Sequence, residues 1–312
     1  MMKRFMLAAV VIFSATLLYA DDVRGSFDRT LKVSGPVELR LENGSGAVHV
    51  RGGPAGTVTI HAEVRVRGGN AEEKLRRLEQ NPPIVQTGNS ISVGQNLDPD
   101  LRRNAGLNYD IVVPADTRVD VHTGSGNEEV SGIKGPVNAR TGSGAVRITD
   151  VPGEVTVDTG SGGVELENIG TLVRAHTGSG SVRADLSGTR SGNGPRTTVE
   201  TGSGSIELQN VHGGLYAHTG SGHVSVSGEP TADWDVHTGS GGVELNLPSD
   251  AAFDLAAHTG SGHIKVDHPI IMQGAIGNRH NVEGKVRGGG PRLEVRTGSG
   301  GIYIASGGSQ PL

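Results

Sequence analysis

The chain has 312 residues and a formal net charge of −5, with both signs scattered, so no basic stripe indicates nucleic acid and no polybasic segment indicates an anionic lipid surface. It has no cysteine, which excludes disulfides, thiolate metal sites, cysteine nucleophiles and lipid attachment through an N-terminal cysteine. Glycine accounts for 51 residues and aromatic residues for only 3%, so we expect a thin, repetitive core.

The N-terminus has the layout of a secretory signal peptide. Lys3 and Arg4 precede an apolar run from residue 5 to 18, and Leu18-Tyr19-Ala20 is followed by two aspartates. We predict cleavage after Ala20, which makes residues 1–20 a signal peptide. No comparable apolar run recurs, so we expect no integral membrane segment in the exported chain. An uncleaved membrane anchor is the alternative, because Leu18 is bulky for its position before the cut.

Residues 70–80 carry the pattern of a short amphipathic helix. Leu75 and Leu78 fall on one face, acidic residues occupy the first turn, and Asn81-Pro82-Pro83 ends the segment. We predict one short helix here, in the N-terminal half, that covers the first units of the repeat described next.

A tetrapeptide recurs through the rest of the chain. Asn-Gly-Ser-Gly begins at Asn43, and Thr-Gly-Ser-Gly begins at Thr123, Thr141, Thr159, Thr177, Thr201, Thr219, Thr238, Thr259 and Thr297. Most steps are 18 or 19 residues, and the last step, of 38 residues, predicts two units of 19. So short a unit cannot bury its own apolar face, so the units must stack about 4.8 Å apart as paired rungs.

We therefore predict an all-β fold. It is a single-domain β-solenoid over residues 22–305, built of rungs of about 18 residues, roughly fourteen in number. A flexible tail over residues 306–312 follows, because that segment is rich in glycine and serine.

Two columns of residues support in-register stacking. The column two residues before Thr alternates large and small: Val121, Ala139, Val157, Ala175, Val199, Ala217, Val236 and Ala257. The column six residues after Thr alternates acidic residues with basic or neutral ones: Glu129, Arg147, Glu165, Arg183, Glu207, Ser225, Glu244 and Lys265. Stacked rungs would place unlike charges side by side, which indicates control of register on an exposed face.

The turn residues have a structural explanation. Glycine accepts positive φ and lets stacked turns approach closely, and Thr and Ser hydroxyls can bond to the next rung. A second turn closes the rung with Asx and glycine, as at Asp150, Asn168 and Asn210. Calcium-binding repeats would need Asp in each turn, and nine copies of a serine nucleophile cannot each have an acid and a base. An inserted segment at residues 186–197 predicts a loop, which is a common place for binding.

Five histidines lie near the turns of three units: His218, His223, His237, His258 and His263. In a stacked model they share one edge, where imidazoles could hold a divalent metal, but no second-shell carboxylates can be placed. We therefore keep these five only as weak metal candidates, and we assign no metal site, no cofactor-binding residue and no catalytic residue.

A polysaccharide lyase or hydrolase is the main enzymatic alternative. Such an enzyme would need paired carboxylates, usually with aromatic platforms for sugar rings. Here the glutamates of the column six residues after Thr alternate with Arg and Lys, which neutralise them. Trp234, the single Trp, falls at a core position four residues before Thr238.

Three stretches carry a resemblance to a known family: residues 108–114 leading into residues 119–126, the Thr-Gly-Ser-Gly repeats, and residues 288–291 before residues 293–300. They resemble the bacterial "putative adhesin" family, also described as a domain of unknown function with β-strand repeats, over about Phe27 to Ile304. The resemblance implies an exported protein of bacterial envelopes and supplies no catalytic residues.

We expect an exported, non-enzymatic, adhesin-like module without a cofactor, periplasmic or secreted to the cell surface. Its expected partner is an extended glycan or an envelope protein, met through many weak repeated contacts. The alternatives are the polysaccharide-active enzyme and a scaffold in envelope-stress signalling.

Overall fold

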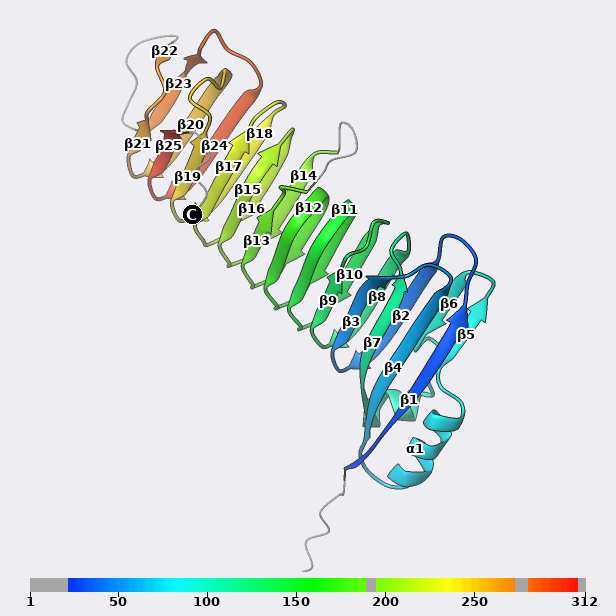
Figure 1. Cartoon of the computed structure of the whole chain (residues 1–312). Coiled ribbons are helices and arrows are strands. Elements are labelled where there is room, and N and C mark those ends of the chain that lie inside the picture. The colour runs from blue at the N-terminus through cyan, green and yellow to red at the C-terminus, as the bar shows by residue number, and fades with distance from the viewer. Residues whose placement is uncertain (1–21, 189–194, 273–279, 308–312) are drawn as a thin grey trace, which may run out of the picture.

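The computed structural model describes residues 22–188, 195–272 and 280–307, and it is an elongated stack of β-strand rungs (Figure 1). The predicted signal peptide, the middle of the predicted loop at 186–197 and most of the predicted tail lie outside these residues. Each rung has a strand that leads into the repeated turn and a strand that leaves it. The first strands form the pre-turn face and the second form the post-turn face, so the prediction of an all-β solenoid is confirmed.

The pre-turn face is a row of hydrogen-bonded strands. Its spatial order is β5 (Ile84–Thr87), β6 (Ser90–Val93), β2 (Glu38–Ser45), β8 (Arg118–Ser125), β10 (Val137–Thr141), β11 (Val146–Thr159), β12 (Val164–Thr177), β14 (Thr197–Thr201), β16 (Leu215–Thr219), β18 (Trp234–Ser240), β24 (Arg292–Ser299), β20 (Phe253–Ser261), β23 (Asn281–Val286) and β22 (Ile270–Met272). The pairing is parallel except at the two ends, where β5 and β23 run antiparallel to their neighbours.

The post-turn face is the second row. Its spatial order is β1 (Val23–Lys32), β4 (Thr57–Val66), β7 (Ala105–Pro114), β3 (Val48–Gly53), β9 (Glu128–Ser131), β11, β12, β13 (Val182–Asp185), β15 (Ile206–His212), β17 (Val224–Glu229), β19 (Val243–Leu247), β25 (Ile302–Ser306) and β21 (Ile264–Val266). Strands β11 and β12 are long enough to turn the corner between rungs, so they belong to both faces. The first three strands pair antiparallel and form a small sheet that ends the stack.

Two helices lie near this N-terminal end. The predicted helix is confirmed as α1 (Ala71–Gln80), which buries Ala71, Leu75 and Leu78 against β1 and β4. The prediction of a single helix is wrong, because α2 (Pro99–Asn104) follows an Asp98 N-cap whose carboxylate accepts from the amide of residue 100. Neither helix in the described part of the chain is long and apolar enough to cross a membrane.

The core consists of apolar columns that run along the stack. All eight residues of the alternating column before the turn are buried, and their registers place each beside its counterpart in the neighbouring rung. Trp234 is buried between Leu215 and Leu293, and its indole N–H donates to the carbonyl of Gly213 at 2.7 Å, so its prediction as a core residue is confirmed.

The turn threonines join the rungs through their hydroxyl groups. In eight turns Oγ1 donates to the carbonyl of the fourth turn residue in a neighbouring rung, at 2.8–3.1 Å. These threonines are buried, and each such bond stabilises the fold by about 0.5–1.5 kcal/mol. Asn43 substitutes for Thr in the first rung, where its amide donates to the carbonyls of Gly46 and Leu107.

The repeated glycines are required mainly by close approach between turns. A Cβ on Gly144 would lie 1.7 Å from the carbonyl oxygen of Gly126, and one on Gly162 would lie 1.7 Å from that of Gly144. Among the glycines of the repeated turns only Gly46 and Gly300 have positive φ. At the second corner of the rung Asp150, Asn168 and Asn210 have positive φ, as predicted for the Asx residues there.

The spatial order of the rungs departs from the chain order at both ends. The rung of β24 and β25, the last in sequence, lies between the rung of β18 and β19 and the rung of β20 and β21. The rung of β2 and β3 likewise lies between β8 and β9 on one side and β6 and β7 on the other. The predicted two rungs of 19 residues after Thr259 are therefore wrong, because that segment supplies β21, β22 and the antiparallel β23 and then returns. The ten repeated turns mark ten rungs, fewer than the roughly fourteen expected.

Candidate functional site

A groove runs along the post-turn face, across the strands of successive rungs. Its volume is about 610 Å³. Its floor is a column of small residues four positions after the start of each turn: Ala47, Asn127, Ala145, Gly163, Ser181 and Ser205. Its rim is the column two residues further along each strand: His49, Glu129, Arg147, Glu165, Arg183 and Glu207. Because each rung contributes one floor residue and one rim residue, the groove lies parallel to the axis of the stack.

The rim confirms the predicted alternation of charge. Arg147 forms an ion pair with Glu165 of the next rung. Arg183 donates from both Nε and Nη2 to one carboxylate oxygen of Glu207, at 2.9 and 2.7 Å. Ion pairs this exposed contribute only about 0–1 kcal/mol to stability, so their main effect is to hold guanidinium and carboxylate groups in fixed positions beside the groove.

The charged column changes where the last rung is inserted. The sequence places Lys265 next to Glu244, but Tyr303 of β25 lies between them. The ammonium group of Lys265 is 4.5 Å from the centre of the Tyr303 ring, and the Tyr303 hydroxyl donates to Asp267 at 2.5 Å. This hydrogen bond holds the pKa of Asp267 below its usual value.

The five candidate histidines flank the repeated turns, but their three rungs are not successive, because the rung of β24 and β25 is inserted among them. His218 and His237 are neighbours on the pre-turn face, with ring centres 5.0 Å apart, but Arg296 of the inserted β24 separates His237 from His258. His223 and His263 precede post-turn strands, with the rungs of Thr238 and Thr297 between them. In the described ranges no three His, Cys, Asp or Glu side chains form a group that could hold a metal ion.

Burial affects the one close histidine pair. Desolvation, followed by the neighbouring His218, lowers the pKa of His237. A second positive charge on this pair is therefore disfavoured near neutral pH.

A buried carboxyl group, which is not among the residues predicted from the sequence, lies beneath the groove. Glu128 occupies the position five residues after the turn start, where its neighbours in the stack are Val48 and Val146. It is only 1% exposed. Its Oε1 accepts a hydrogen bond from Thr123 at 2.9 Å, while Oε2 has no hydrogen-bond partner among the described residues. Burial raises its pKa to about 8, so Glu128 is mainly protonated at neutral pH.

The signal for Glu128 was present in the sequence. Every other Thr-Gly-Ser-Gly rung has Val or Ile at this position, so an acid there departs from the column. Glu128 borders the groove, but at 1% exposure it offers a ligand almost no surface.

The chain resembles several known proteins. The family model Toastrack DUF4097 matches residues 110–305, which include all nine Thr-Gly-Ser-Gly turns. A "putative cell adhesion protein" from Clostridium sporogenes is 13% identical, with a TM-score of 0.27, and the match covers 91% of this chain and 100% of that one. A "putative adhesin" from Bacteroides fragilis is 11% identical, with a TM-score of 0.39, and the match covers 90% and 97%. The search of curated proteins gave no match.

Proposed function

This chain belongs to the Toastrack DUF4097 family, and we propose that it is a non-enzymatic, adhesin-like module that binds an extended glycan along the groove of the post-turn face. The observation that supports this most directly is the repetition of one small floor residue and one polar rim residue over six successive rungs. A ligand with a repeating unit can make similar weak contacts at each rung, and such contacts add when they are linked.

The direction of the groove favours a glycan over a peptide. An extended peptide usually binds by adding a strand to a sheet edge, where backbone groups are free. The groove instead crosses strands whose backbone groups already pair with the neighbouring rungs. Recognition must therefore use side chains, and the hydroxyls, carboxylates and guanidinium groups here suit the hydroxyl groups of sugars.

The charges on the rim support binding without cleavage. A glycosidase needs one carboxyl group that holds a proton at working pH and a second that is ionised. Glu165 and Glu207 each form an ion pair with an arginine of the rim, so both carboxylates already have a guanidinium partner. Glu128 also borders the groove, but it is only 1% exposed, so little of it is within reach of a ligand there.

We also propose that the protein is exported, to the periplasm, the medium or the cell surface, with residues 1–20 removed. The charged start, apolar run and following aspartates support this. N-terminal sequencing of the protein recovered from a cell envelope fraction should give Asp21 as the first residue. Recovery with Met1 intact would instead support an uncleaved anchor.

The binding proposal is tested by filling the groove. Ser181 is an exposed floor residue, and Ser181→Tyr should weaken binding to the best ligand of a bacterial and host polysaccharide panel about tenfold or more, because the ring occupies space that the sugar needs. Ser179→Tyr makes the same change at the exposed turn of the same rung, outside the groove, and should bind like the wild type.

Chain cleavage is scored in the same assay. Release of shorter products would contradict the non-enzymatic part of the proposal. Equal loss of affinity in both tyrosine variants, or none in either, would show that the ligand does not bind in the groove.

A further inference from the structure

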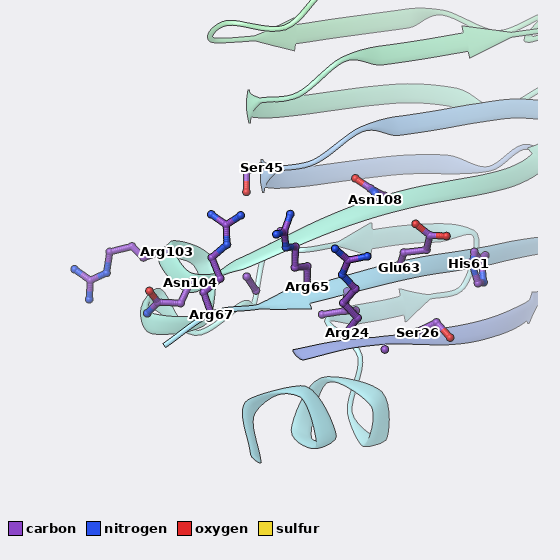
Figure 2. A pocket seen from close by; sticks show the side chains of 14 residues that line it. Arg24, Ser26, Ser45, His61, Glu63, Arg65, Arg67, Arg103, Asn104 and Asn108 are labelled. Atoms are coloured by element: carbon purple, nitrogen blue, oxygen red, sulfur yellow. The ribbon is translucent and has the colours of Figure 1, made fainter. Parts of the chain in front are cut away.

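A second cavity lies at the N-terminal end of the same face (Figure 2). It has a volume of about 850 Å³ and opens over the antiparallel strands β1, β4 and β7. Alternation along these strands turns Arg24 and Arg65 outward, and register places them side by side. The next residue across is Gly106, where an added Cβ would come no closer than 3.6 Å to its neighbours, so the absence of a side chain leaves the surface open there.

Positively charged side chains outnumber negatively charged ones in the cavity, although the protein as a whole is acidic. Four guanidinium groups line it, those of Arg24, Arg65, Arg67 and Arg103, against the single carboxylate of Glu63. Figure 2 shows Arg24, Arg65 and Arg67 extending in the same direction, toward the strand that carries Asn108, whereas Arg103 points away. The whole chain has a net charge of −5, so this concentration is local. Like charges gathered in this way repel one another unless an anion lies between them.

One carboxylate already shows what these arginines bind. Asp22, just before β1, accepts hydrogen bonds from Arg65 through Nε at 2.7 Å and through Nη2, and from Nε of Arg67 at 3.2 Å. This contact lowers the pKa of Asp22. Arg24 has no ion-pair partner in the part of the chain that the structure describes, so the side of the cluster nearest β1 retains an unneutralised guanidinium group.

Neutral donors complete the lining. Asn108 accepts the backbone N–H of Ala47 through Oδ1 at 3.0 Å, which leaves its Nδ2 group as a donor. Ser26 and Ser45 add hydroxyl groups to the lining. Guanidinium, amide and hydroxyl donors together suit a group with several acceptor oxygens, such as a carboxylate or a phosphate.

The cavity adjoins the groove of the proposed function. Strands β7 and β3 pair so that Asn108 stands beside Ala47, the first floor residue of the groove. An elongated ligand lying in the groove would therefore reach the arginine cavity at its N-terminal end.

We propose that the arginine cavity binds an acidic group, a carboxylate or a phosphate, of an anionic glycan that extends into the groove. This inference rests on the proposed function and narrows its ligand to acidic glycans.

The test compares acidic and neutral ligands on the full exported chain. Oligomers of glucuronic acid, phosphorylated oligosaccharides and neutral glucose oligomers of equal length are titrated, and the two acidic arms separate carboxylate from phosphate. We expect at least one acidic oligomer to bind more tightly than the neutral one, with an affinity that falls as salt is raised. Arg24→Gln should weaken that acidic ligand about tenfold and leave neutral binding unchanged.

Arg118→Gln is the matched control, because it removes one exposed guanidinium from the pre-turn face and should change nothing. Equal affinity for acidic and neutral oligomers, with no effect of Arg24→Gln, would overturn the inference and leave the proposed function standing. Absence of binding to every oligomer would overturn both. Arg24-dependent binding to vesicles of acidic phospholipid, without binding to acidic oligomers, would also overturn the inference.

Discussion

Glu128 shows how one residue can depart from a column that is otherwise apolar. In most other rungs this position is a valine or isoleucine that packs against valine or isoleucine of the neighbouring rungs. The carboxyl group of Glu128 instead has one hydrogen bond, from Thr123, and one oxygen without a partner among the described residues. Asp120 is the charged group that also acts on it, and its negative charge raises the pKa of Glu128 further. Such a group is tolerated in the core mainly because it stays protonated.

This residue gives a prediction about stability and pH. The folded protein keeps the proton of Glu128 up to about pH 8, whereas the unfolded chain loses it near the ordinary value of 4.5. Between these values the folded state binds more protons, so the free energy of unfolding should fall as pH rises through this window, by an amount on the order of a few kcal/mol. Thermal unfolding from pH 4.5 to 9 measures the slope.

The valine variant provides the comparison. Glu128→Val restores the column, so it should be more stable than the wild type at pH 8 and should lack this part of the pH dependence. Parallel pH profiles for the two proteins would contradict the buried, protonated state of Glu128.

The turn is the element that sets the spacing of the stack. Its buried threonine bonds to the neighbouring rung, and its two glycines leave no side chain between adjacent backbones. This arrangement explains why the tetrapeptide repeats while the residues around it vary in polarity and charge. Packing between rungs therefore explains the repeated tetrapeptide without a ligand.

Two adjacent glycines test this explanation. A Cβ on Gly162 would lie 1.7 Å from the carbonyl oxygen of Gly144, whereas one on Gly163 would meet only the carbonyl oxygen of Ser181 at 3.7 Å, an ordinary contact. Gly162→Ala should therefore cost at least about 1–3 kcal/mol of unfolding free energy, and Gly163→Ala should have little effect. Chemical denaturation of both variants measures the difference, and equal stabilities would show that the turns can separate without cost.

At the scale of the whole molecule, one rung near each end of the stack lies between two other rungs, out of its order in the chain. A simple solenoid loses only its terminal unit when the last rung is deleted, since each rung contacts only its neighbours. Here the last rung in sequence has a rung on either side, and its residues Leu293, Val295, Ile302 and Ile304 are buried. Strands β24 and β25 are thus part of the interior of the stack.

Truncation after Arg287 should therefore do more than shorten the protein. It would remove β24 and β25 and leave the segment of β20 and β21 without its parallel neighbours. We expect rapid tryptic cleavage at Lys265 and Lys285 in the truncated protein and slow cleavage in the wild type, as measured by limited proteolysis. A chain truncated after Gly307 keeps both strands and should resist like the wild type. Equal resistance of all three proteins would show that the inserted rung is dispensable.

Much of the architecture could be read from the amino-acid sequence. The repeated turn, the buried columns around it, the alternation of Glu and Arg and the left-handed Asx residues are local or periodic features, so they follow from residue chemistry and spacing. The helix at 71–80 was predictable for the same reason. The exposed floor of small residues was also present as a column in the sequence, although only the structure shows that it forms a groove.

The tertiary structure alone decided which rungs are neighbours and which charged groups gather. All rungs share one backbone register, so the repeat period cannot specify whether a rung packs beside its neighbour in sequence or beside a more distant one. That choice separates His237 from His258 by inserting Arg296, and places Tyr303 between Glu244 and Lys265. The arginine cavity combines residues far apart in a part of the chain without the repeat, and only the antiparallel pairing of β1, β4 and β7 brings them together.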